Sequence, residues 1–280
     1  GSRAIWLSFG LGLVAPLLML SQNWDDHSRK GRWVDIEFAK NLLNSCEKDA
    51  ILFTGGDNDT FPLWYIQEVE GFRTDVRIVN LELLISDWYI HHLTMPHNGA
   101  RPVPISMKRE DYAGEKDIVI RDFPSQTFVF PANRDDLLKN KVLNMEEVGL
   151  MKGNEFMSWK FRARGSSANS YIFRKDSAMI NIIRNIANEG WELPIYFANT
   201  LGTASLLNLN DFLRMEGLAS RLVPIPKSAG TPNDMYYGWI SRERMEKNFR
   251  EKFVYQGLND PKVNHDEHIR DRIIGNYRQP

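Results

Sequence analysis

The segment at residues 51–65, ILFTGGDNDTFPLWY, constrains the fold more than any other part of this chain. Its first residues, together with Ala50, form a short apolar run that is typical of a buried strand, and two glycines and a helix-like pattern follow. Asp57 and Asp59 come directly after the glycines. The order strand, loop, helix therefore predicts an α/β fold with both carboxylates at the carboxyl ends of parallel strands, where such folds bind ligands.

The rest of the chain extends this unit into a larger domain. Residues 75–80 and 193–199 have the composition of parallel strands, and residues 218–226 that of a final strand. Spacing and capping residues predict helices at 33–46, 60–70, 88–93 and 177–188. The second is capped by Asp59 or Thr60, has Pro62 in its first turn and ends at Gly71; the third is capped by Ser86 or Asp87, and the fourth lies between Asp176 and Gly190. An edge strand is predicted at 102–106, and a hairpin or meander is predicted from 117–121 and 127–130. Residues 135–164 show no clear pattern. The fold class that we predict is an open, mainly parallel, Rossmann-like sheet flanked by helices, with a β-hairpin insertion and a helical C-terminal tail at 237–253 and 266–277.

Residues 4–20 form an uncharged and strongly apolar run. As a helix this run would be about 26 Å long at ~1.5 Å per residue, close to the ~30 Å hydrocarbon core of a bilayer. We expect part of a membrane span, although a buried core helix would have the same composition. Gly1 and Ser2 resemble a cloning remnant, so we expect a piece of a longer protein. The predicted parts are the apolar helix at 1–21, the α/β domain at 22–232 and a helical extension at 233–280.

Charge and cysteine content argue against several functions. Acids and bases nearly cancel to a net charge of −1, which leaves no electrostatic footprint for a nucleic-acid partner. Cys46 is the single cysteine, so no internal disulfide forms, and no histidine is positioned near it in the sequence to make a catalytic thiol. The sequence also lacks a GxGxxG or Walker motif for nucleotides.

The ends of the three predicted parallel strands are rich in polar residues. Because these ends meet at one edge of the sheet, we expect their side chains to line a common crevice. Carboxylate, amide and hydroxyl groups together suit a sugar, a cation or both, and an aromatic ring can stack on a sugar, although aromatic side chains at such positions also pack in cores. The predicted ligand-binding residues are Asp57, Asn58, Asp59, Asn80, Glu82, Asp87, Trp88, Asn199 and Thr200, with Thr203 beside them.

Asp57 and Asp59 form an Asp-x-Asp motif, which sugar-nucleotide transferases use to hold a divalent cation against a diphosphate. Alternate residues of an extended segment point to the same side, so both carboxylates would reach one ion. We therefore name Asp57 and Asp59 as a candidate metal site and a divalent cation as the possible cofactor. A turn followed by a helix N-terminus explains the same residues without a metal.

A second polar cluster, Asp25, Asp26, His27 and Arg29, follows the apolar run. If that run crosses a membrane, these side chains would meet lipid headgroups, a lipid-linked donor or other parts of the protein. A solvated linker, with an aspartate as the cap of the next helix, explains them as well.

Five segments occur together and in order: QNWDDH at 22–27, the strand–loop–helix at 50–65, QEVEG at 67–71, RTDVR at 73–77 and DWYI at 87–90. They resemble the soluble C-terminal region of the bacterial protein O-mannosyltransferase-like membrane proteins of glycosyltransferase family 117. The resemblance implies transfer of a lipid-linked sugar to proteins outside the cytoplasm, with the catalytic acid in a membrane part that this chain lacks. It also implies a place at the bacterial inner membrane, with this domain in the periplasm.

Three functions remain open from the sequence. The first is an accessory domain that binds the acceptor protein or a glycan and has no activity alone. Its partners would be the membrane part of the same polypeptide and a lipid-linked sugar. The second is a metal- and nucleotide-sugar-dependent glycosyltransferase that uses Asp57 and Asp59, and the third is a purely structural module.

Overall fold

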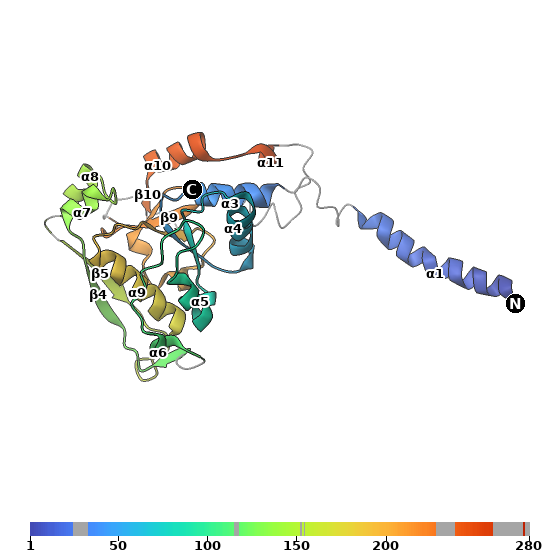
Figure 1. The fold of residues 1–280 in the computed structure, drawn as a ribbon, viewed down its shortest axis with the longest axis horizontal. Helices are drawn as coiled ribbons and strands as arrows, with labels where there is room; N and C mark the ends of the chain where they lie inside the picture. Colours follow the sequence, from blue (N-terminus) through green and yellow to red (C-terminus); the bar gives the residue numbers. More distant parts are fainter. Residues whose placement is uncertain are drawn as a thin grey trace.

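The computed structural model describes residues 1–24, 33–114, 118–151, 153, 155–227, 239–259 and 277 (Figure 1). In these residues the main sheet has six strands in the order β10-β8-β9-β7-β1-β2. β1 pairs in parallel with both β2 and β7, as the sequence predicted. The strands are β1 (Ile51–Thr54), β2 (Arg77–Asn80), β7 (Ile195–Ala198), β8 (Leu213–Met215), β9 (Ala219–Leu222) and β10 (Trp239–Ile240).

The other half of the sheet is of mixed direction. β9, the final strand predicted at 218–226, runs antiparallel to both β7 and β8. β10 then pairs in parallel with β8, and neither of these two short strands was predicted. The predicted class, an open α/β sheet with mainly parallel pairs and flanking helices, is confirmed.

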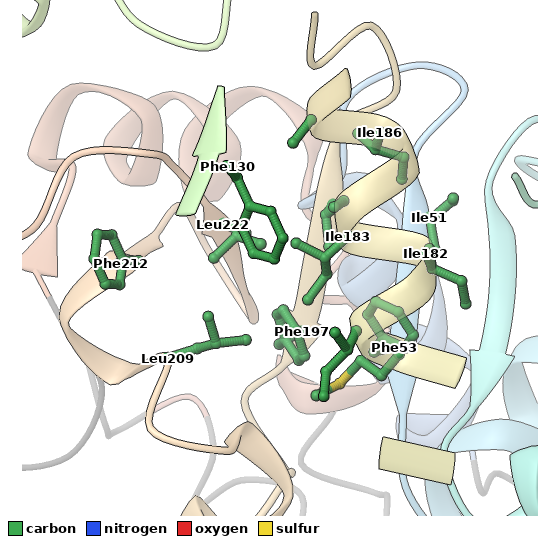
Figure 2. Close-up of a cluster of buried hydrophobic side chains, with 14 of the residues drawn as sticks. Ile51, Phe53, Phe130, Ile182, Ile183, Ile186, Phe197, Leu209, Phe212 and Leu222 are labelled. Atoms are coloured by element: carbon green, nitrogen blue, oxygen red, sulfur yellow. The ribbon is translucent and has the colours of Figure 1, made fainter. Parts of the chain in front are cut away.

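One face of the sheet packs against α9 (Arg174–Asn188) through a large hydrophobic core (Figure 2). Ile51 and Phe53 of β1 point to this face, because alternate residues of a strand face the same way. α9 begins three residues before the predicted start, and the carboxylate of Asp176 in its first turn accepts a hydrogen bond from the Phe173 backbone N–H at 2.9 Å. Figure 2 also labels Phe130, Ile182, Ile183, Ile186, Phe197, Leu209, Phe212 and Leu222 in this core.

The opposite face is covered by α3 (Val34–Asn44) and α4 (Asp57–Glu70), which lie together in Figure 1. Leu52 and Ile78 point to this second core, whose strand residues alternate with those of the first. α4 ends as predicted at Gly71, whose φ of 64° is the left-handed conformation that glycine adopts at low cost. The sheet is therefore buried on both faces, as parallel sheets require.

A long insertion between β2 and β7 carries most of the smaller elements. The predicted hairpin between 117–121 and 127–130 is wrong: β3 pairs antiparallel with β6, and β4 pairs antiparallel with β5. The edge strand predicted at 102–106 does not form, although Val103 N–H donates to the Leu93 carbonyl oxygen at 2.9 Å. The elements are η1 (Leu83–Ile85), α5 (Asp87–Leu93), α6 (Arg109–Tyr112), β3 (Val119–Arg121), β4 (Gln126–Pro131), α7 (Arg134–Lys139), α8 (Met145–Gly149), β5 (Phe156–Phe161) and β6 (Tyr171–Phe173).

The C-terminal part of the chain crosses the end of the sheet and continues as short helices. The predicted helix at 237–253 begins only after β10, and the one predicted at 266–277 lies outside the described residues except for Tyr277. The elements are η2 (Thr203–Leu206), η3 (Asn210–Phe212), α10 (Arg242–Lys247), a π-helical turn (Asn248–Lys252) and α11 (Gln256–Asn259).

The apolar run forms the helix α1 (Ser2–Gln22), which lies apart from the α/β body in Figure 1. None of its residues is buried, so the alternative of a core helix of this domain is wrong. Its mean hydropathy of 1.9 and its length make it, within the described residues, the one helix suited to cross a membrane.

Candidate functional site

The carboxyl ends of β1, β2 and β7 lie side by side, so the structure brings the three predicted polar segments to one edge. Asn80 is the last residue of β2, the outer strand of the three, and is buried. Its Nδ2 donates to Thr60 Oγ1 at 2.8 Å, and Thr60 Oγ1 lies 2.9 Å from Thr54 Oγ1. Asn80 Oδ1 accepts from the backbone N–H groups of Glu82 and Leu83 at 2.8 and 3.0 Å. These groups satisfy one another, so they fix the loops of the edge in place.

Asp59, the residue before Thr60 in α4, is also buried. Its carboxylate accepts a hydrogen bond from the Thr200 hydroxyl, which joins the ends of β1 and β7. Burial raises the pKa of Asp59, and the hydrogen bonds from Thr200 and from the Gly55 backbone oppose this rise only in part. The structure therefore joins Asp59 and Thr200, two of the predicted ligand-binding residues, through a contact within the protein.

The geometry that the sequence predicted for a metal is wrong. α4 begins at Asp57 with Gly56 as its N-cap, so neither Asp59 nor Thr60 is the cap, and Pro62 falls in the second turn. Residues two apart on a helix point in different directions, and Asp57 is exposed while Asp59 is buried. Among the described residues, no group of three His, Cys, Asp or Glu side chains is placed to hold a metal ion.

The remaining predicted residues lie around this edge. Asn58, Glu82 and Thr203 are exposed, and Glu82 pairs with Lys175 at 2.7 Å, whereas Asn199 is buried. The carboxylate of Asp87 accepts from the backbone N–H groups of Gly114 and Trp88 at 2.9 and 2.7 Å, and these bonds lower its pKa. The second polar cluster (Asp25, Asp26, His27 and Arg29) lies outside the described residues.

A pocket of about 320 Å³ lies along the outer strand β2, between α4 and α5. We call it the tryptophan pocket, because Trp64 and Trp88 line it and the indole of Trp88 is 60% exposed. The Trp88 and Tyr89 rings meet edge to face at 5.5 Å. The Tyr89 hydroxyl also accepts from the Asn80 backbone N–H at 2.9 Å, so the pocket wall is tied to the polar edge.

Buried and exposed polar groups share this pocket. Arg77 is only 6% exposed, and its Nη2 donates to the His92 carbonyl oxygen at 3.1 Å. Its Nη1 has no hydrogen-bond partner among the described residues, and burial lowers the pKa of the guanidinium. Glu68 accepts from His97 Nε2 at 2.7 Å, which lowers the pKa of the carboxyl. The pocket thus combines an open aromatic face with a charged donor and an acceptor.

Sequence reasoning missed Arg77 as a site residue. Arg77 is the first residue of β2, and a charged residue directly before the apolar Ile78 and Val79 of a buried strand was the signal for an unusual environment. The same signal marks Arg221 in β9 and Arg214 in β8, which are buried at the other end of the sheet.

Fold and site together define a class: a mixed α/β domain that follows an apolar helix of membrane-spanning length and carries an aromatic pocket along the outer strand of its sheet. This chain belongs to the family described as TMEM260-associated domain 2, which matches residues 35–122 and 119–241.

A mouse relative, named protein O-mannosyl-transferase TMEM260, is 35% identical over 82 residues. The match covers 28% of this chain but only 12% of the mouse protein. No solved structure matches the chain. The predicted kinship with O-mannosyltransferase-like membrane proteins is confirmed at this coarse level, whereas the bacterial origin and glycosyltransferase family 117 stay predictions.

Proposed function

We propose that this chain is the accessory domain of a membrane protein that glycosylates other proteins, and that its tryptophan pocket binds a sugar or the acceptor polypeptide. The name of the mouse relative supports the link to protein O-mannosylation. α1 supports attachment to a membrane, because it exposes apolar side chains along its whole length. On this proposal the domain stands outside the cytoplasm, in the periplasm of a bacterial inner membrane.

The exposed indole of Trp88 is the observation that carries the binding role. Sugar rings present apolar C–H faces that stack on such rings, while their hydroxyl groups need hydrogen-bond partners. Arg77 and Glu68 offer a donor and an acceptor in the same pocket. The volume of about 320 Å³ is at the small end of the usual range for ligand pockets, which suits one or two sugar units or a short peptide segment.

The geometry favours binding over catalysis. Asp59 is committed to Thr200, and Glu82 to Lys175, so these two predicted acids have partners within the protein. Metal-dependent transfer by Asp57 and Asp59 is disfavoured, because the helix separates the two carboxylates. We therefore place the catalytic acid in a membrane part of the same polypeptide, which would also hold the lipid-linked sugar.

Saturation-transfer NMR with methyl α-mannoside, and separately with a Ser/Thr-rich peptide, tests this function. We expect transfer from the wild-type protein to at least one of these probes, and its loss in Trp88→Ala. Trp33→Ala is the matched control, because Trp33 is 58% exposed and lies outside the pocket. Binding that survives in Trp88→Ala would exclude the tryptophan pocket as the binding site, and a lack of binding to both probes would leave the domain with a structural role only.

A further inference from the structure

A second pocket, of about 620 Å³, lies at the opposite end of the parallel strands. Residues 47–49, just before β1, and 192–194, just before β7, form one side of it. The segment after α7 and the helix α10 form the other sides. We call it the basic pocket, because eight Lys or Arg side chains line it against five Asp or Glu.

Most of the basic side chains in this pocket lack an acidic partner. The exceptions are Arg101, which pairs with Glu192 at 2.6 Å, and Arg244, which lies 3.5 Å from Glu47 and 3.6 Å from Glu216. The other basic residues make no ion pair with any carboxylate among the described residues; they are Lys48, Lys139, Lys141, Arg221, Lys247 and Lys252. Clustered like charges repel one another, so the basic pocket favours an anion.

Arg221 lies at the floor of the basic pocket and is only 1% exposed. Its Nη1 donates to the Lys141 carbonyl oxygen at 3.0 Å, and its guanidinium lies 5.9 Å from the centre of the Tyr196 ring. Its Nε has no hydrogen-bond partner among the described residues. A buried guanidinium without a carboxylate partner is costly for a folded protein, and such a cost is typical of binding sites.

The nearby carboxylate of Glu216 does not fill this role. One of its oxygens pairs with Arg214 at 2.6 Å, and the other accepts from the Tyr196 hydroxyl at 2.7 Å. Burial favours the neutral acid, yet the charges of Arg214, Arg221 and Arg244 outweigh it and lower the pKa of Glu216. Glu216 is thus an ionised partner of Arg214, and Arg221 remains available to a ligand.

We propose that the basic pocket binds a phosphate or diphosphate group. A guanidinium can donate two parallel hydrogen bonds to phosphate, and lysines around it add point charges. The positive charge of several unpaired lysines is larger than one carboxylate on a ligand would neutralise, whereas a diphosphate carries several negative charges. The group could belong to a soluble phosphate ester or to the headgroup of a lipid. This site is separate from the tryptophan pocket, so a test of phosphate binding does not depend on the function proposed above.

Calorimetric titration of the whole chain with pyrophosphate tests the proposal, with sulfate at equal ionic strength as the reference anion. We expect pyrophosphate to bind more tightly than sulfate, and the pair Lys247→Gln/Lys252→Gln to weaken its binding at least tenfold. Lys160→Gln/Arg162→Gln is the matched control, since both residues are exposed at or beside β5, lie outside the pocket and remove the same charge. Arg221→Lys keeps the charge but loses the forked donor, and should also weaken binding.

Two results would overturn the proposal: pyrophosphate binding no tighter than sulfate, or an equal loss in the control pair. Neither Lys247 nor Lys252 is buried, so this pair keeps the test valid if the Arg221 variant does not fold. Nanodiscs of phosphatidylcholine with and without phosphatidic acid distinguish the sources of the ligand. If only the nanodiscs that contain phosphatidic acid compete with pyrophosphate, the ligand is a lipid headgroup. If neither kind of nanodisc competes, the ligand is a soluble phosphate ester.

Discussion

At the scale of single residues, the carboxylate of Asp59 is in an environment that disfavours its ionised form. It is 7% exposed, and its partners are a hydroxyl and a backbone group instead of a cation. Since its pKa is higher in the folded than in the unfolded chain, the folded state prefers the protonated form. The free energy of unfolding therefore loses a contribution as the pH rises from the unfolded pKa of about 3.9 through the raised folded value.

Asp59→Asn should remove this loss, because asparagine stays neutral and the Thr200 hydroxyl can rotate to keep a hydrogen bond. We expect the variant to have a higher Tm than the wild type at pH 7, and the difference to disappear at acidic pH. Thermal unfolding at a series of pH values measures this. Asp57→Asn is the control, since Asp57 is exposed and should lose only ~0.3–1 kcal/mol from the helix dipole. A lower Tm of Asp59→Asn at neutral pH would contradict the assignment.

At the scale of elements, β1 and β7 hold the centre of the sheet through one aromatic pair. Phe53 and Phe197 face each other in register, and their rings stack at 5.0 Å with both side chains buried. Phe197→Ala should lower the free energy of unfolding by about 3–5 kcal/mol, the usual cost of such a cavity. Urea unfolding measures it. Val129→Ala on the exposed side of β4 should change little, and a similar loss there would point to a general effect of substitution in strands.

Helices and strands that are specified by residues close together in the sequence could be predicted from the sequence. β1, α4, β2 and β7 follow from runs of apolar residues and from turn glycines close to them in the sequence. β5 carries a readable alternation, with Met157, Trp159 and Phe161 buried, but it lies in the segment that showed no clear pattern. β8 has only three residues with Arg214 in the middle, and that arginine pairs both with Glu216, two residues later, and with the distant Glu147. No local pattern predicts such a strand.

The candidate site was predictable to the same extent. Parallel strands end at a common edge, so the position of Asp59, Asn80 and Thr200 at one edge of the sheet followed from the strand assignments alone. The start of α4 could not be predicted in this way, because Gly56 occupies the N-cap position and both aspartates lie inside the helix. The partners of Arg77 and Arg221 come from distant segments, and burial of a charged side chain cannot be seen in spacing.

At the scale of the whole molecule, the chain combines an α/β body with a helix that the body does not cover. α1 exposes large apolar side chains such as Trp6, Phe9 and Leu11. Helices of this kind are stable in lipid, where their backbone groups are already paired. The protein as a whole should therefore attach to bilayers through α1, with the body in the aqueous phase.

Leu11→Lys tests this arrangement, because Leu11 lies near the middle of α1. A lysine at the centre of a bilayer costs ~2.5–3.5 kcal/mol, so the partition of the protein into phosphatidylcholine vesicles should fall roughly 100-fold. Flotation of the protein with vesicles on a density gradient measures it. Leu150→Lys is the control, since Leu150 is 52% exposed on the α/β body and the same substitution there should leave flotation unchanged. If Leu11→Lys floats like the wild type while Leu150→Lys does not, the body and not α1 holds the protein at the membrane.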